Sequence, residues 1–138
     1  MLYCFCTEEK YMNPDILMFF DQKPLELDLY LAFEAAVLGR FPDTQISIQK
    51  TQISLRSKYI FACVSLRRKK NWPDHCILVS LGMPEKIDSP RIAEGSRISA
   101  GRWTLHIPIA AQNDIDSELM NWLEIAHSLA SRPGRRLS

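Results

Sequence analysis

The chain has 138 residues, a formal net charge of +1 and 46% hydrophobic residues. This composition is typical of a globular protein and excludes a chain that is disordered throughout. The most apolar stretch, residues 29–38, contains Glu34 and is far shorter than the about 20 residues that a membrane-spanning helix needs. The N-terminus reaches Glu8 and Glu9 too soon for the apolar core of a secretory signal. We therefore expect a cytoplasmic protein without a membrane segment.

The length is close to that of a common single domain. The sequence contains no internal repeat, low-complexity run or inter-domain linker. We expect a short N-terminal segment over residues 1–12, one domain over residues 13–131 and a flexible tail over residues 132–138.

Helical signals occur near both ends of this domain. Asn13 and Pro14 are typical first residues of a helix, which should run to about Phe20. A second helix is expected to begin between Asp21 and Pro24 and to end at about Leu38, with Gly39 as its stop signal. A last amphipathic helix is expected over residues 113–130, capped by Asn113-Asp114 and carrying Trp122 on its apolar side.

Between these helices, apolar residues recur at every second position or in short continuous runs, which indicates strands. The segments are residues 46–48, 53–55, 59–66, 76–81 and 103–109, with Trp103 expected in the core. Residues 84–100 contain two prolines and a glycine and are expected to form a long loop. The order of elements predicts an α+β domain, with an antiparallel sheet of about five strands and the N-terminal and C-terminal helices packed on one face.

Charge is distributed unevenly along the chain. Residues 1–43 carry 8 acids and 3 bases, residues 44–73 carry 7 bases and no acid, and residues 74–138 carry 8 acids and 7 bases. This arrangement predicts a polarised electrostatic surface, provided that the bases share one face.

Alternation within the strands predicts which bases point away from the helices. If Ile53 and Leu55 face the helices, Arg56 and Lys58 face outward, and the same reasoning on the last strand places Arg102, Thr104 and His106 outward. Lys50 shares parity with inward residues, so only a bulge would turn it outward. The run Arg67-Arg68-Lys69-Lys70 before Trp72 could grip phosphates, or could be a solvated hairpin. The candidate ligand-binding residues, for an anion or nucleic acid, are Lys50, Arg56, Lys58, Arg67, Arg68, Lys69, Lys70, Arg102 and His106; the alternative is an ordinary polar sheet face.

Catalytic and metal signals are weak. The cysteines at positions 4, 6, 63 and 76 are expected to be free thiols. Cys4-x-Cys6 has no second ligand pair at zinc spacing, so we predict no structural metal and no cofactor. His106 and His127 are possible general bases, but no recognisable nucleophile motif or glycine-rich phosphate loop accompanies them. His127 is expected to have a packing or surface role, at the border of the last helix's apolar stripe.

The sequence resembles a bacterial family of domains of unknown function over about residues 19–127. The matching residues are Phe20-Asp-Gln-Lys-Pro24 with Tyr30, Lys50-Thr51 with Ile53, Phe61-Ala62 with Val64, Gly101-Arg102-Trp103 with His106, and Ile115-Asp116, Glu118-Leu119, Trp122-Leu123 and Ala126. Similar domains stand alone or follow nuclease-like regions, so the resemblance implies an association with nucleic acid but no activity. It also singles out Lys50, Thr51, Arg102 and His106 as polar residues in an otherwise apolar pattern.

Three functional hypotheses follow. The first is a binding module for an anionic ligand or nucleic acid on a basic sheet face. The second is a protein-interaction or homodimerisation domain that uses this face or an edge strand. The third is an enzyme that acts on an anionic substrate through His106 and Arg102.

Overall fold

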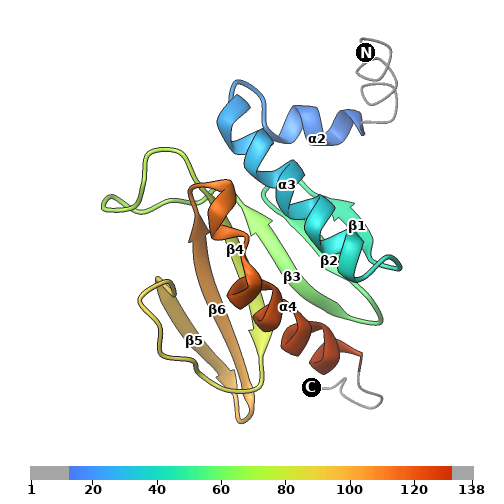
Figure 1. Cartoon of the computed structure of the whole chain (residues 1–138), viewed down its shortest axis with the longest axis vertical. Coiled ribbons are helices and arrows are strands. Elements are labelled where there is room, and N and C mark those ends of the chain that lie inside the picture. Colours follow the sequence, from blue (N-terminus) through green and yellow to red (C-terminus); the bar gives the residue numbers. More distant parts are fainter. Residues whose placement is uncertain (1–12, 132–138) are drawn as a thin grey trace.

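The computed structural model describes residues 13–131 (Figure 1). The helical elements are α2 (Pro14–Phe19), α3 (Pro24–Arg40), the short 3-10 helix η1 (Gln112–Asp114) and α4 (Ser117–Ala130). The strands are β1 (Gln45–Ile48), β2 (Ile53–Arg56), β3 (Ile60–Ser65), β4 (Ile77–Met83), β5 (Glu94–Ser99) and β6 (Arg102–Ile109). The expected N-terminal segment, with Cys4 and Cys6, and the expected tail lie outside the described residues. No helix within residues 13–131 is long and apolar enough to cross a membrane.

The strands form a single antiparallel sheet in the order β1-β2-β3-β4-β6-β5. The predicted α+β class is therefore confirmed, with six strands instead of about five. The additional strand is β5, so the prediction of an unbroken loop over residues 84–100 is wrong. Five of the six residues in β5 are exposed. This strand therefore lacks the apolar alternation that reveals a half-buried strand, and it owes its extended form to pairing with β6 at the edge of the sheet.

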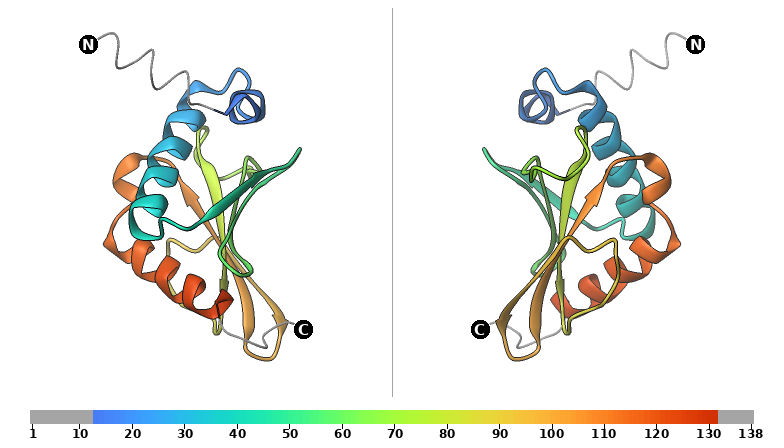
Figure 2. Two further views of the ribbon diagram at one scale, coloured as in Figure 1. Left: turned by 90° about the vertical axis from the view of Figure 1, so that its right-hand side faces the viewer. Right: turned by 90° about the vertical axis from the view of Figure 1, so that its left-hand side faces the viewer.

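Helices α3 and α4 cover the same face of the sheet, as the side views in Figure 2 show. The core lies between this face and the two helices. Its cross-strand row Ile53, Val64, Val79 and Ile107 is fully buried, and Trp122 of α4 is 7% exposed. Trp103, predicted in the core, is only half-buried and packs against the edge of the core. No helix among the described residues covers the opposite side of the sheet, which we call the open face.

The helix boundaries follow the local chemistry, with two corrections. The Asn13 side chain accepts a hydrogen bond from the backbone N–H of Asp15 at 2.8 Å, as expected of a cap. Helix α3 does not stop at Gly39 but continues to Arg40, because the N–H of Phe41 still bonds to the carbonyl of Val37 at 2.7 Å. Helix α4 is not capped by Asn113-Asp114, which belong to η1.

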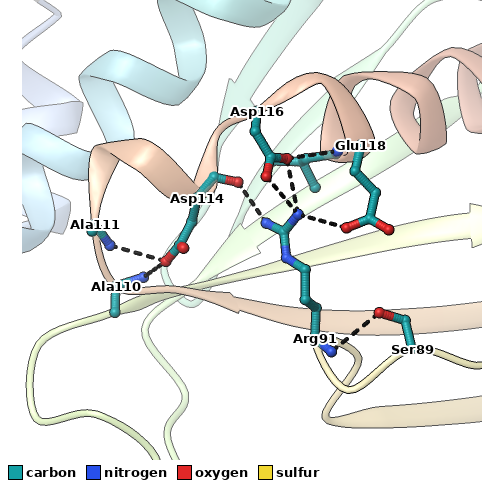
Figure 3. A network of polar contacts seen from close by, with 8 residues as sticks. Ser89, Arg91, Ala110, Ala111, Asp114, Asp116 and Glu118 are labelled. Atoms are coloured by element: carbon teal, nitrogen blue, oxygen red, sulfur yellow. Dashed lines mark hydrogen bonds and ion pairs between the residues drawn. The ribbon is translucent and has the colours of Figure 1, made fainter.

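The α4 cap is Asp116, and the same residue also fastens the chain that leads to β5. Strands β4 and β5 both run antiparallel to β6, so residues 84–93 must return along the length of the sheet. Arg91 ties this crossover to the start of α4, with Nη1 at 2.9 Å from Asp116 Oδ1 and 3.1 Å from Glu118 Oε1 (Figure 3). Its Nη2 donates to the Asp114 carbonyl at 2.5 Å. Arg91 therefore ties the crossover, shortly before β5, to the start of α4.

Candidate functional site

A row of polar side chains crosses the open face from one edge of the sheet to the other. Strand pairing brings six residues into register, one from each strand: Ser47, Ser54, Cys63, Ser80, His106 and Glu94. Each is next in sequence to a residue that faces the helices, so the alternation of the strands alone assigns the row to the open face.

The centre of this row is a hydrogen-bonded pair. Ser80 Oγ lies 2.7 Å from His106 Nδ1, and both side chains are half-buried. Burial lowers the pKa of His106; Arg67 and Lys69 lower it further, and Glu94 opposes them. The imidazole is therefore neutral at neutral pH, and which atom donates depends on the tautomer.

Beside this pair, Cys63 lies in a small amide and hydroxyl cluster. The Gln52 amide donates to Ser54 Oγ at 3.2 Å and to Cys63 Sγ at 3.5 Å, and Ser54 Oγ donates to Gln49 Oε1 at 3.3 Å. Burial raises the pKa of the Cys63 thiol, so this group is not the activated thiolate that nucleophilic catalysis needs.

The run of four bases lies in the loop between β3 and β4, residues 66–76, which we call the basic loop. Arg67 Nη2 lies 3.4 Å from Glu94 Oε1, and Lys69 Nζ contacts Glu94 Oε2. Glu94 belongs to β5, so the loop reaches over β4 and β6 on the open face. Leu78 also faces this side of the sheet and is only 1% exposed. The two ion pairs therefore tie one part of the loop to the edge of the sheet, while the side chains of all four bases remain exposed.

The other two bases of the run are placed differently. Arg68 Nη1 lies 3.9 Å from Asp74 Oδ1 and donates to the Trp72 carbonyl at 3.4 Å, so its contacts stay within the loop. Lys70 is exposed.

A second group of bases lies at the opposite end of the open face. Arg56 pairs with Ile60 across a β-bulge, is exposed, and donates to the Lys58 carbonyl at 3.3 Å. The register puts Arg102 at the same end, on β6, about 14 Å along the strand from His106 at about 3.4 Å per residue. The structure therefore places predicted residues at two separate positions on one face, with His106 close to the position of Arg67 and Lys69.

Lys50 does not join either group. It lies in the turn between β1 and β2 and lines a cavity with Asp15, Met18 and Phe19 of the α2 region. His127 also lies elsewhere, on the helix side, stacked on Phe41 with 4.2 Å between ring centroids. This position agrees with the packing role expected for it.

Sequence reasoning missed Ser80 and Glu94. Ser80 is the single polar residue in the run Cys76–Leu81, a signal that could have marked an open-face position. Glu94 gave no signal, because its segment was interpreted as loop and its nearest partners are far away in sequence.

Among residues 13–131, the charged groups near His106 pair with one another. Both oxygens of Glu94 contact the basic loop, and among the described residues no carboxylate accepts a hydrogen bond from His106. No group of three or more His, Cys, Asp or Glu in this part of the chain is placed to hold a metal ion. The groups on this face can form hydrogen bonds and ionic contacts: they are hydroxyls, an imidazole, and guanidinium and ammonium groups.

A separate polar cavity of about 240 Å³ lies between the start of α3 and the end of the basic loop. Its wall includes Glu26, a buried carboxylate whose Oε2 lies 3.0 Å from Nδ1 of His75. This contact holds the end of the basic loop against α3, as Glu94 holds its beginning against β5.

Comparison with known proteins gives one match. A family model described as "Domain of unknown function (DUF5655)" matches residues 19–130. No curated protein and no solved structure matches the chain significantly.

Proposed function

The chain belongs to the DUF5655 family of domains of unknown function, so its function has to be inferred from its own geometry. We propose that the domain is a binding module and that its open face binds the phosphate groups of an anionic ligand. Single-stranded nucleic acid is the ligand class that this face fits best.

The observation that carries the proposal is the placement of the bases on the open face. Arg56 and Arg102 lie at one end, Arg67 and Lys69 at the other, and Glu94 is the one acid among the strand residues on that face. A face of this kind attracts anions, and guanidinium groups bind oxyanions through forked hydrogen bonds.

The separation of the two groups favours an extended ligand. A small anion can contact the bases at one end only, whereas a chain of phosphates can contact Arg56 and Arg102 at one end and the basic loop with His106 at the other. The hydroxyls of Ser80 and Thr104 add uncharged donors along the same path. Such contacts carry little sequence information, so we expect weak sequence preference.

The test is a titration of a short fluorescent single-stranded oligonucleotide, with inorganic phosphate as a separate arm, at about 50 mM and about 200 mM salt. We expect binding that weakens with salt, and a smaller salt slope for Arg56→Ala and Arg102→Ala, by about one unit each. Arg102→Lys should also weaken binding, because lysine keeps the charge but loses the fork.

The matched control is Arg40→Ala, which removes the same charge from the helix side of the molecule, where Arg40 pairs with Glu124 at 3.2 Å. It should leave binding unchanged. Absence of oligonucleotide binding at low salt, or equal loss in the Arg40 and Arg102 variants, would reject the proposal. Binding of phosphate alone, without the oligonucleotide, would replace nucleic acid by a small anion as the ligand.

A second candidate, a protein-interaction domain, is favoured by the edge strand β5. Its outer residues are exposed, and Ile98 is 58% exposed. A partner strand could pair there. Sedimentation of the protein alone distinguishes this candidate, since an association through this edge would persist at high salt while phosphate binding would not.

A further inference from the structure

Glu94 is a carboxylate held by cations on a face that otherwise carries bases. Its Oε1 lies 3.4 Å from Arg67 Nη2, and its Oε2 contacts Lys69 Nζ. The side chain is 30% exposed, whereas those of Arg67 and Lys69 are about half exposed, at 51% and 52%. The two oxygens of one carboxylate thus satisfy two cations that would otherwise face solvent.

His106 completes the surroundings of this carboxylate. Glu94 and His106 are register partners on β5 and β6, which puts their Cβ atoms about 5 Å apart. The N–H of Ala93 donates to the His106 carbonyl at 2.8 Å and fixes this alignment. Arg67 and Lys69 therefore contact this carboxylate, and His106 lies beside it on the neighbouring strand.

A phosphate group presents the same chemistry as this carboxylate. It offers anionic oxygens at similar spacing, with more of them, and Arg and Lys bind either group through charge-assisted hydrogen bonds. The hydrogen bond from Lys69 is the main cause that holds the pKa of Glu94 below its usual range, so the carboxylate is ionised and bound in the free protein.

We propose that Arg67, Lys69 and His106 form an oxyanion site, that Glu94 occupies this site in the free protein, and that a phosphate group of the ligand displaces it. This inference rests on the proposed function, because it names the subsite that the phosphate enters. Glu94 then competes with the ligand for the same cations and weakens its binding. A ligand with several phosphates can offset the free energy needed to displace Glu94.

The structure gives Glu94 room to leave. Exposed ion pairs are individually weak. Strand β5 lies at the edge of the sheet, and its pairing with β6 is interrupted by a bulge between Arg97 and Ser99. The carboxylate can swing to solvent without disturbing the buried rows on the other face.

The test is the affinity of Glu94→Gln for the same oligonucleotide. We expect binding about two- to fivefold tighter than that of the unchanged protein, the range that corresponds to the strength of an ordinary exposed ion pair. The control for a general charge effect is Asp74→Asn, which removes one acid from the basic loop itself, whereas Glu94 belongs to β5. Asp74 is 92% exposed and lies 3.9 Å from Arg68, so its loss should change affinity less.

A pair of double variants then shows whether the gain comes from the freed cation. In the Glu94→Gln background, Lys69→Gln should abolish the gain, whereas Lys70→Gln should lower affinity but leave the gain measurable against Lys70→Gln alone. Lys70 is the matched control because it is the next residue, with the same charge, and does not contact Glu94.

The outcomes separate this inference from the proposed function. If the unchanged protein binds and Glu94→Gln binds no more tightly, or if Asp74→Asn gives an equal gain, the internal competitor is refuted and the binding face stands. If neither the unchanged protein nor Glu94→Gln binds, both ideas fail. A gain that survives Lys69→Gln would also overturn the assignment of Lys69 to the site.

Discussion

The two faces of the sheet are built from neighbouring residues of the same strands. On the helix side, Ile53, Val64, Val79 and Ile107 form one cross-strand row with no exposed surface. On the open face, a second cross-strand row consists of their sequence neighbours Ser54, Cys63, Ser80 and His106. A shift of one residue in register would exchange the two rows, so burial of the apolar row also fixes the polar one.

This difference indicates that the helix side stabilises the fold and that the open face presents the groups available for binding. The apolar row and the helices supply the free energy of folding, since each buried side chain leaves water. The open face carries polar and charged groups in addition, such as a half-buried imidazole and closely spaced cations. Substitutions on the two faces should therefore affect stability and binding differently.

The largest loss of stability is expected from Trp122→Ala. Trp122 is 7% exposed, and Arg91 lies over its ring at 5.8 Å. Loss of such a core aromatic should lower the free energy of unfolding by about 3–5 kcal/mol in urea. Trp103→Ala, the same change at a half-buried site, should cost clearly less. Equal costs would mean that the two tryptophans are equally buried in solution.

Arg91→Gln should have the next largest effect. It removes contacts to Asp116, Glu118 and the Asp114 carbonyl, from a guanidinium that is 21% exposed. We expect a loss of about 1–2 kcal/mol in the free energy of unfolding, measured in urea. The control is Arg40→Gln, which breaks one exposed pair and should cost less than about 1 kcal/mol. A change at Arg91 no larger than at Arg40 would show that the crossover does not depend on this network.

The spacing of apolar residues along the sequence predicted most of the core and the fold class, because burial on one face of a helix or strand imposes regular spacing on these residues. The exposed edge strand β5 could not be predicted in this way. Its extended form comes from hydrogen bonds to β6, and no residue in Glu94–Ser99 is buried.

The candidate site could be predicted only in part for a similar reason. Alternation correctly assigned Arg102 and His106 to the side away from the helices, since it depends on local geometry. The partners of His106 and of the basic loop depend on which strands are neighbours. Ser80 is 26 residues from His106, and Glu94 is 25 residues from Lys69. Only the order β4-β6-β5 brings these residues together.

The pH dependence of stability tests the contribution of His106 on the open face. Burial, reinforced by Arg67, lowers the pKa of His106 in the folded protein, whereas an unfolded histidine titrates near about 6.5. Below that pH the unfolded state binds more protons, so stability falls as pH decreases, down to the folded-state pKa. His106→Gln lacks this contribution, and it should lose less stability than the unchanged protein between about pH 7 and pH 5. An equal or steeper loss in the variant, from urea unfolding at each pH, would contradict the stated direction.

The smallest effect on stability is expected from Arg102→Ala, the variant on which the binding test depends most. Arg102 is half-buried, and no ion pair or side-chain hydrogen bond from it occurs among residues 13–131. Its removal should change the free energy of unfolding by no more than about 0.5 kcal/mol, although it takes away an oxyanion-binding fork from the open face. Unfolding in urea and oligonucleotide titration on the same sample would measure both quantities. If the open face serves binding and the helix side serves stability, Arg102→Ala should weaken binding and leave stability unchanged. A loss of more than about 1 kcal/mol would make Arg102 a structural residue, and its effect on binding could then no longer be assigned to contact with phosphate.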